Sequence, residues 1–182
     1  MSIGKLILYP GNTKSSPPLI TAVIKSLQRV GLIGQPMDSD CNSFLAGDSF
    51  LQLISFMGCS PDICLTPKAN TGSNFCHLTI RGPLPKPQLV WDSACRPPRC
   101  PGCKKPITDW KNGVDGIAIK CHLCGTESAL GDLNWGRCAG FGHIFIEIHN
   151  VFPGEASPLD ILFNQLQQDT GVSWNYFYTG PE

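Results

Sequence analysis

The chain has 182 residues, 42% of them hydrophobic, which suits one domain with an insertion or two small domains. Only 15% of the residues are charged and the formal net charge is zero, which disfavours a dedicated nucleic-acid binder, because phosphate contacts favour a basic excess. No stretch approaches the roughly 20 apolar residues that span a bilayer, and the amino terminus does not form a signal peptide. We therefore expect a cytoplasmic protein without a membrane contact.

The amino-terminal part of the chain predicts a strand followed by a helix. Residues Lys5–Tyr9 are largely apolar and end at a Pro-Gly turn. Ser16 is a typical helix N-cap with prolines directly after it, and apolar residues at helical spacing continue up to Gly31, a typical helix stop. Two further strands are expected at Phe50–Met57 and Cys76–Arg81.

The carboxyl-terminal part repeats this order of elements. Residues Ile144–His149 alternate between apolar and mixed side chains, as in a half-buried strand. Ser157 is expected to open a helix in a capping box with Asp160, and Gly171 is expected to end that helix. Residues 172–178 alternate again and predict a final strand.

Two strand–helix units of the same order indicate an internal pseudo-repeat. The distance from Pro18 to Gly31 equals that from Pro158 to Gly171, although Pro-Gly turns and Ser-Pro helix starts are common enough to coincide by chance. Two β–α–β halves that share one antiparallel sheet would make an α+β protein with a ferredoxin-like sandwich. The proline-rich stretch 83–101 is expected to be extended and to lead into an insertion. The predicted segments are 1–94 for the first half, 95–138 for the insertion and 139–182 for the second half.

Two Cys-x-x-Cys pairs give the firmest functional signal in the chain. Cys100 and Cys103 form the first pair, Cys121 and Cys124 the second, and seventeen residues separate them. This spacing is typical of a tetrahedral Zn–S4 site, since two residues between the cysteines let the backbone bend so that both sulfurs point to one atom. Four thiolates leave no open position for water, so we expect one structural Zn²⁺.

With this spacing, residues 95–138 resemble the zinc-ribbon family of modules. The resemblance implies a zinc-stabilised pair of β-hairpins, and Gly116–Lys120 is expected to form one of the strands. It implies no single function, because zinc ribbons serve in transcription, ribosomes, enzymes and assembly factors. A rubredoxin-like iron site uses the same paired motif and stays an alternative. A thioredoxin-like redox role is disfavoured, because no helical pattern follows either pair.

Six further cysteines are expected to be free and mostly buried as small apolar residues. Cys59 and Cys64, together with Cys76 or Cys95, are an alternative second metal site, but their spacing matches no known iron–sulfur or zinc pattern. The six are Cys41, Cys59, Cys64, Cys76, Cys95 and Cys138.

Polar side chains alternate along two of the predicted strands. If these strands pair, His77 and Arg81 of one would join Glu147 and His149 of the other on one open side of the sheet. Such a cluster suits an anion site, a metal site or acid–base chemistry. The plainer interpretation is a solvated face or a subunit interface, and Phe145 within the cluster favours a covered interface.

Basic residues surround the first cysteine pair. Arg96, Arg99, Lys104 and Lys105 flank it, and Trp110 follows. Basic and aromatic residues beside a zinc ribbon are typical of a nucleic-acid surface. A solvated loop that keeps the cysteine pair soluble is the alternative.

The sequence contains no complete catalytic constellation, so a non-enzymatic role is favoured. We expect a zinc-binding accessory or assembly protein that docks a protein partner, or a second copy of itself, through the zinc ribbon and the open sheet face. One alternative is a nucleic-acid-binding zinc-ribbon protein that uses the basic residues around Cys100. The other is a metal-dependent enzyme or metal-handling factor that uses Glu147 and His149.

Overall fold

The computed structural model describes residues 4–11, 16–37, 40–57, 63–67, 75–113 and 118–181. These residues form a mixed α/β structure whose strand pairings are antiparallel. Within these ranges no helix is both long and apolar enough to cross a membrane. The helices are α1 (Ile20–Arg29), α2 (Phe50–Leu53) and α3 (Asp160–Thr170), and the 3₁₀ turns are η1 (Trp110–Gly113) and η2 (Leu130–Asp132).

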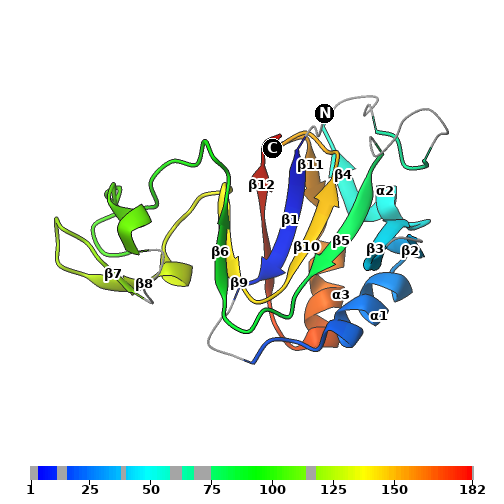
Figure 1. Cartoon of the computed structure of the whole chain (residues 1–182), viewed down its shortest axis with the longest axis horizontal. Helices are drawn as coiled ribbons and strands as arrows, with labels where there is room; N and C mark the ends of the chain where they lie inside the picture. Colours follow the sequence, from blue (N-terminus) through cyan, green and yellow to red (C-terminus); the bar gives the residue numbers. More distant parts are fainter. Residues whose placement is uncertain are drawn as a thin grey trace.

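The main sheet has six strands in the order β12–β1–β10–β5–β3–β2 (Figure 1). Helices α1 and α3 pack against each other and cover one face of this sheet. The strands are β1 (Lys5–Pro10), β2 (Ile33–Met37), β3 (Asp40–Ala46), β5 (His77–Arg81), β10 (Phe145–His149) and β12 (Trp174–Thr179).

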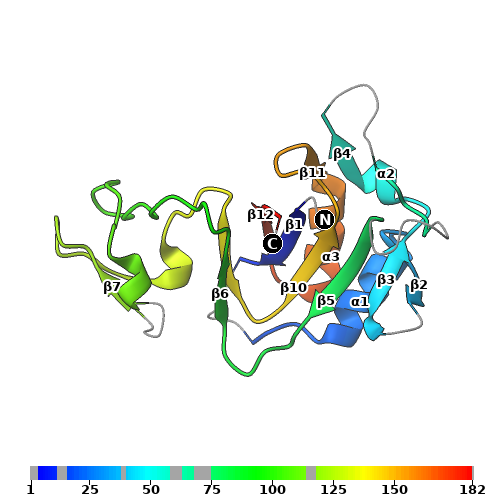
Figure 2. The ribbon, with the colours of Figure 1, turned by 45° about the horizontal axis from the view of Figure 1, so that its top comes forward.

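Three two-stranded sheets lie outside the main sheet. The chain between β6 and β9 extends away from the main sheet and carries β7 and β8 (Figure 2). We call residues 95–138 the cysteine module, and the main sheet with α1 and α3 the α/β body. The paired strands are β4 (Ile54–Phe56) with β11 (Ala156–Pro158), β6 (Gln88–Trp91) with β9 (Ala139–Gly142), and β7 (Ala118–Lys120) with β8 (Glu127–Ala129).

The core of the α/β body lies between the main sheet and the two long helices. Successive side chains of a strand point to opposite faces, so every second residue of the central strands faces the helices. Each buried side chain of this size contributes about 1.5–3 kcal/mol to stability. The buried core residues from β1, β5, β10, α1 and α3 are Leu6, Leu8, Leu78, Ile80, Ile146, Ile148, Val23, Leu27, Leu162 and Leu166.

Both long helices begin later than the sequence predicts. Their N-caps are Leu19 and Leu159, each with an extended backbone and without a side-chain capping bond. Ser16 cannot open α1, because Pro17 precedes another proline and a residue before proline is driven away from helical backbone. Ser157 does not open α3, because it belongs to β11 and pairs with Ser55 of β4.

The ends of the two helices confirm the predicted stops. Gly31 and Gly171 follow α1 and α3 with φ angles of 76° and 72°, a left-handed backbone that glycine adopts without strain. Pro18 and Pro158 each stand two residues before the first helical residue. The equal spacing noted in the sequence therefore corresponds to two helices that each begin two residues after a proline and end before a left-handed glycine.

The predicted strand Phe50–Met57 is only partly correct. Its first four residues form α2, and the strand β4 begins at Ile54. Phe50 and Leu53 are both buried, and their spacing of three suits one helical turn better than a strand. The strands predicted at Cys76–Arg81, Ile144–His149 and 172–178 appear as β5, β10 and β12 with bounds shifted by one or two residues.

Two strand pairs are absent from the sequence prediction. The hairpin of β2 and β3 extends the edge of the main sheet beyond β5. Strand β6 lies inside the proline-rich stretch that was expected only to be extended, and it pairs with β9. Of the strand predicted at Gly116–Lys120, β7 covers Ala118–Lys120, and residues 116–117 lie outside the described ranges.

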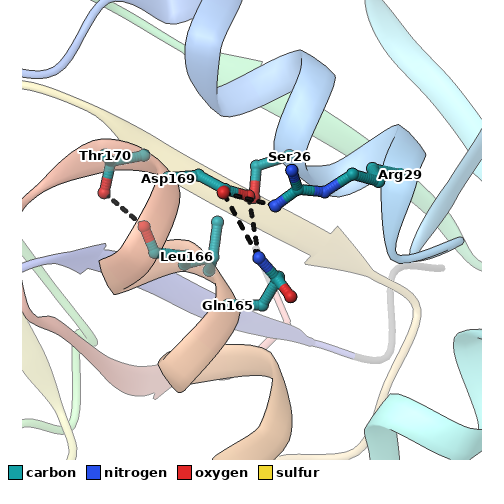
Figure 3. A network of polar contacts seen from close by, with 6 residues as sticks. All are labelled: Ser26, Arg29, Gln165, Leu166, Asp169 and Thr170. Carbon is teal, nitrogen blue, oxygen red and sulfur yellow. Dashed lines mark hydrogen bonds and ion pairs between the residues drawn. The ribbon is translucent and has the colours of Figure 1, made fainter.

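A polar network joins α1 to α3 (Figure 3). The carboxylate of Asp169 on α3 accepts hydrogen bonds from Ser26 and Arg29 on α1. Gln165, one turn earlier on α3, donates to both oxygens of Asp169 at 3.2 Å. The hydrogen bond from the buried Ser26, followed by the interactions with Arg29, holds the pKa of the Asp169 carboxyl below its ordinary value.

Candidate metal centre and polar sheet face

The four paired cysteines meet at one point of the cysteine module. Their Sγ atoms all lie within 4.8 Å of one another. Sγ of Cys100 is 3.6 Å from that of Cys124, and Sγ of Cys103 is 3.8 Å from that of Cys121. Four sulfurs at 2.3 Å from a central zinc ion would lie about 3.8 Å apart in a tetrahedron. The four sulfurs are therefore gathered closely enough that they could hold a metal ion.

The two cysteine pairs sit in loops of the same backbone geometry. The amide of Cys100 donates to the carbonyl of Lys105 at 2.9 Å, and the amide of Cys121 donates to that of Thr126 at 2.9 Å. In each loop the fourth residue after the first cysteine has a left-handed backbone, with φ of 61° at Lys104 and 74° at Gly125. Each loop thus directs the two sulfurs of its own pair toward the two sulfurs of the other pair.

Thiols at this distance interact strongly with one another. Thr126 is the main cause that lowers the pKa of the Cys124 thiol to about 6. The backbone of Lys105 lowers the pKa of Cys103, but burial and the neighbouring thiols raise it to a final value of about 11. Four thiolates therefore need a cation among them, because like charges at contact distance oppose further ionisation.

A small apolar cluster supports the cysteine loops. Trp110 and Trp135 pack edge to face with ring centroids 5.0 Å apart, and the Trp135 indole donates a hydrogen bond to the Leu130 carbonyl at 2.8 Å. Ile107 and Ile119 are buried beside them. The module thus has a core of its own, separate from that of the α/β body.

The expectation that six cysteines are free is wrong for two of them. Cys95 and Cys138 form a disulfide with Cα atoms 5.2 Å apart. This bond closes the base of the cysteine module, because β6 and β9 bring the two ends of the module together. Sequence spacing could not indicate the pair, since the two cysteines are 43 positions apart.

The remaining cysteines do not form a second cluster among the residues that the structure describes. Cys76 is free and buried in the α/β core, where burial raises its pKa to about 12. Cys64 is free and half-buried. Cys59 and the side chain of Cys41 lie outside the described residues.

The four polar residues predicted for the sheet face do come together, and we call Lys5, His77, Arg81, Glu147 and His149 the polar sheet face. Strands β5 and β10 are neighbours, with Thr79 opposite Glu147 and Arg81 opposite Phe145. The imidazole rings of His77 and His149 stack with centroids 4.4 Å apart. Lys5 of β1, opposite His149, is the member that the sequence analysis missed.

Glu147 is at the centre of the polar sheet face and is only 8% exposed. Its Oε2 lies 3.4 Å from Lys5 Nζ and 3.7 Å from His149 Nε2. Its Oε1 lies 3.3 Å from Arg81 Nε, and the Arg81 guanidinium also stands 4.9 Å from the centroid of the Phe145 ring. A buried carboxylate is thus held by several cationic or protonatable groups, which compensates for its lost hydration.

This side of the sheet is open only in part. Ile7, Phe145 and Phe177 are fully buried there, and Leu84 and Val90 pack over them. The cover therefore comes from the chain itself, from β6 and the segment before it. The apolar character of Phe145 indicated a covered surface, but sequence alone did not reveal which segment covers it.

The predicted basic residues divide into two groups. Arg96 and Arg99 line a cavity of about 430 Å³ at the base of the module, together with Arg137 and Trp135. Lys104 and Lys105 are exposed on the first cysteine loop and do not line this cavity. Arg137 was not singled out in the sequence, because it is distant from the other basic residues along the chain.

Comparison with known proteins finds no match for this chain among family models, curated proteins or solved structures.

Proposed function

We propose that this protein is a zinc-binding accessory or assembly protein that docks a partner protein through the cysteine module. The observation that carries the proposal is the cluster of four thiols, whose separations suit tetrahedral coordination. All four positions around the ion would be protein ligands, so the metal would be structural. A structural metal fixes the surface of a small module and so prepares it for binding.

We infer that the ion is Zn²⁺ and that the module is a zinc ribbon. Zn²⁺ has no redox chemistry, which suits a site where Cys124 is exposed to solvent. The two similar cysteine loops, the second of which joins the paired strands β7 and β8, agree with the hairpins of a ribbon. Metal analysis of protein purified without added metal would test this; iron in place of zinc would contradict it.

The α/β body supports the proposal of a ferredoxin-like sandwich. Without its additional strands, the body has the chain order β1–α1–β5–β10–α3–β12 and the sheet order β12–β1–β10–β5. A βαββαβ order with the third strand between the first and second is the pattern of that fold. The cysteine module would then be an insertion between the two halves, after β5 and before β10.

The docking surface that we favour is the second cysteine loop. Leu123, between Cys121 and Cys124, is 60% exposed. An exposed apolar side chain on this loop would gain stability by burial in a pocket of a partner. The covered part of the sheet face has less capacity to bind a partner, since Leu84 and Val90 already pack there.

Photo-crosslinking tests the docking role. A photoreactive amino acid at position 123 should give an adduct of one defined mass, and twice the monomer mass would identify a second copy of the chain as the partner. The matched control is position 19, where Leu19 is 74% exposed on the α/β body. With the identified partner purified, Leu123→Ser should weaken binding by about thirty-fold, as for a hot-spot residue. The same adduct from both positions, or none from position 123, would contradict the proposal.

A second candidate function is binding of nucleic acid. It is favoured by the cavity at the base of the module, where Arg96, Arg99 and Arg137 are gathered beside Trp135. Guanidinium groups bind phosphate and an indole stacks on bases. Affinity for single-stranded RNA or DNA that falls steeply with salt would support this candidate, and no binding at low salt would remove it.

Acid–base catalysis by Glu147 has less support. Both carboxylate oxygens of Glu147 are already engaged, with Lys5 and Arg81. A second metal ion per chain would be required for the metal-dependent alternative at Glu147 and His149. Metal analysis that finds two ions per chain would revive it.

A further inference from the structure

The disulfide between Cys95 and Cys138 lies at the wall of the cavity of about 430 Å³ at the base of the cysteine module. Cys138 lines this cavity, whereas Cys95 does not. Both cysteines are half-buried, so the bond is not sealed inside the core of the module. The cavity volume is in the range of small-molecule sites, which span roughly 300–1,000 Å³. A small molecule held in the cavity would therefore lie next to the Cys138 half of the disulfide.

The cavity has a positive charge that is not offset by a carboxylate in its lining. Its cationic lining residues are Arg96, Arg99 and Arg137, and all three are exposed. None of them forms an ion pair with a carboxylate of the described residues. Arg99 donates to the Lys104 carbonyl at 3.4 Å, and the Arg137 guanidinium stands 3.9 Å from the centroid of the Tyr176 ring. Both contacts leave the charge of the guanidinium uncompensated.

The carboxylate nearest to the disulfide along the chain, that of Asp92, is engaged elsewhere. Its oxygens accept hydrogen bonds from the backbone amides of Ala94 and Gly180, one on each. Asp92 lines a cavity over the polar sheet face and does not line the one beside the disulfide. Arg96 and Arg137, in contrast, are each the direct chain neighbour of one cysteine of the disulfide. The disulfide therefore lies in a positively charged environment.

This arrangement favours exchange with thiols that carry a negative charge. Disulfides are opened by a thiolate, and a cleft of positive charge raises the local concentration of anions. A nearby guanidinium also stabilises the cysteine thiolate that departs when the bond breaks. Carboxylates on the incoming thiol suit this cavity, because guanidinium groups bind carboxylates through paired hydrogen bonds.

We propose that this cavity binds a small thiol that carries carboxylate groups, and that the bound thiol opens the disulfide. Its thiolate attacks Sγ of Cys138 and forms a mixed disulfide there, while the electron pair of the broken S–S bond stays on Sγ of Cys95. A second acidic thiolate then attacks the sulfur of the bound thiol, and the electron pair of the mixed disulfide stays on Cys138. The two thiols together lose two electrons as they become a disulfide, and the protein disulfide gains both. Each reacting thiol gives its proton to solvent, and each released cysteine thiolate can take one back.

Such a site would make the closure of the module respond to the acidic thiols around the protein. The covalent link at its base is released, while the pairing of β6 with β9 remains as a connection. The inference uses the same arginines as the nucleic-acid candidate, but it requires neither nucleic acid nor docking at Leu123. Its failure and the failure of either proposed function are therefore separate outcomes.

Thiol exchange with three probes of different charge tests the site on the full chain. The probes are mercaptosuccinate, which is anionic, 2-mercaptoethanol, which is neutral, and cysteamine, which is cationic. Each rate is divided by the rate of the same thiol with 2-hydroxyethyl disulfide, which removes differences in intrinsic reactivity. Mercaptosuccinate should exceed 2-mercaptoethanol by about ten-fold in this ratio, and added salt should reduce the difference.

Peptide mass mapping after acid quenching should place the mercaptosuccinate adduct on Cys138, because this cysteine lines the cavity. An equal or larger ratio for cysteamine, an adduct on Cys95 instead, or no adduct with millimolar mercaptosuccinate would overturn the proposal.

Two variants with the same change of charge show whether the cavity is responsible. Arg96→Gln removes a guanidinium from the cavity and should lower the mercaptosuccinate ratio by about three-fold. Lys105→Gln removes one positive charge from the first cysteine loop, outside the cavity, and should leave the ratio unchanged. Both side chains are exposed, so neither change should lower the melting temperature. No loss in Arg96→Gln, or an equal loss in Lys105→Gln, would contradict the assignment to this cavity.

Discussion

The α/β body and the cysteine module are stabilised in different ways. The body buries a continuous set of aliphatic side chains between six strands and two helices. The module has a smaller cluster around two tryptophans, together with one disulfide and four clustered cysteines that could hold a metal ion. Short segments cannot bury enough apolar surface to fold alone, so cross-links take the place of a large core.

This difference indicates that different perturbations should unfold the two regions. Loss of apolar packing should affect the body first, whereas loss of metal or disulfide should affect the module first. The two regions are connected by the β6–β9 pair and by Arg137, whose carbonyl accepts a hydrogen bond from the Tyr178 amide and whose guanidinium stands over the Tyr176 ring. Three changes, given from the largest expected effect to the smallest, test how independent the regions are.

The largest effect is expected from loss of the metal. Cys121→Ser removes one buried ligand, and a structural zinc site contributes on the order of 10 kcal/mol to the folding of a small module. Bound metal should fall from one ion per chain to none, and the near-ultraviolet dichroism of Trp110 and Trp135 should decrease. Denaturant unfolding of the body should keep its midpoint.

Cys64→Ser is the matched control, because Cys64 lies outside the four-cysteine cluster. It should leave metal content and the tryptophan signal unchanged. If Cys121→Ser instead unfolded the whole chain in one transition, the two regions would be a single cooperative unit.

A smaller effect on stability is expected when the disulfide at the base of the module is removed. The bond between Cys95 and Cys138 closes a loop with a sequence separation of 43. Replacing both cysteines by alanine should lower the free energy of unfolding of the module by up to about 4 kcal/mol, through greater chain entropy of the unfolded state. A metal ion held by the four cysteines would already close part of the same loop, so the measured loss should be lower when metal is bound.

Thermal unfolding with and without a reductant measures this contribution. The reductant should lower the melting temperature of the unsubstituted chain and have no effect on the double variant. Thiol titration of the folded chain that found Cys95 and Cys138 both reactive would contradict the disulfide.

The smallest effect concerns the polar network between α1 and α3 (Figure 3). The pKa of Asp169 is depressed, mainly by Ser26, so its contribution is present above the ordinary carboxyl pKa of about 4 and is lost as pH falls through the lower folded value. Asp169→Asn should therefore lower stability at neutral pH and flatten its decline in acid. The amount of metal bound by the cysteine module should be the same in Asp169→Asn as in the unsubstituted chain.

Denaturant melts at a series of acidic and neutral pH values check this prediction. Asp48→Asn, in an exposed turn, should leave the free energy of unfolding at neutral pH unchanged. An acid decline as steep in Asp169→Asn as in the unsubstituted chain would show that other carboxylates control it.

The features that sequence predicted well depend on near neighbours in the chain. The four cysteines are recognisable because each Cys-x-x-Cys pair determines its own loop, as the matching bonds of Cys100 and Cys121 show. The polar sheet face could be anticipated because alternation fixes which side chains share a face once two strands pair. The helix stops at Gly31 and Gly171 are equally local.

The features that sequence missed depend on distant contacts. Cys95 meets Cys138 only because β6 pairs with β9, and neither strand has a strong pattern of its own. The start of α3 is set by pairing of Ser157 with β4, which overrides its capping tendency. Lys5 belongs to the polar sheet face because β1 lies beside β10, and the sequence does not indicate that strand order.

The pairing of β6 with β9 also bears on how such a chain can be rearranged during evolution. Trp91 lies directly opposite Ala139, so the two points where the long excursion leaves and rejoins the body are adjacent. A segment whose termini already meet can be gained, shortened or exchanged while every other connection keeps its length, because closing a loop between neighbouring positions costs little entropy. The body can then be inherited as a constant platform, while the excursion varies in length and sequence.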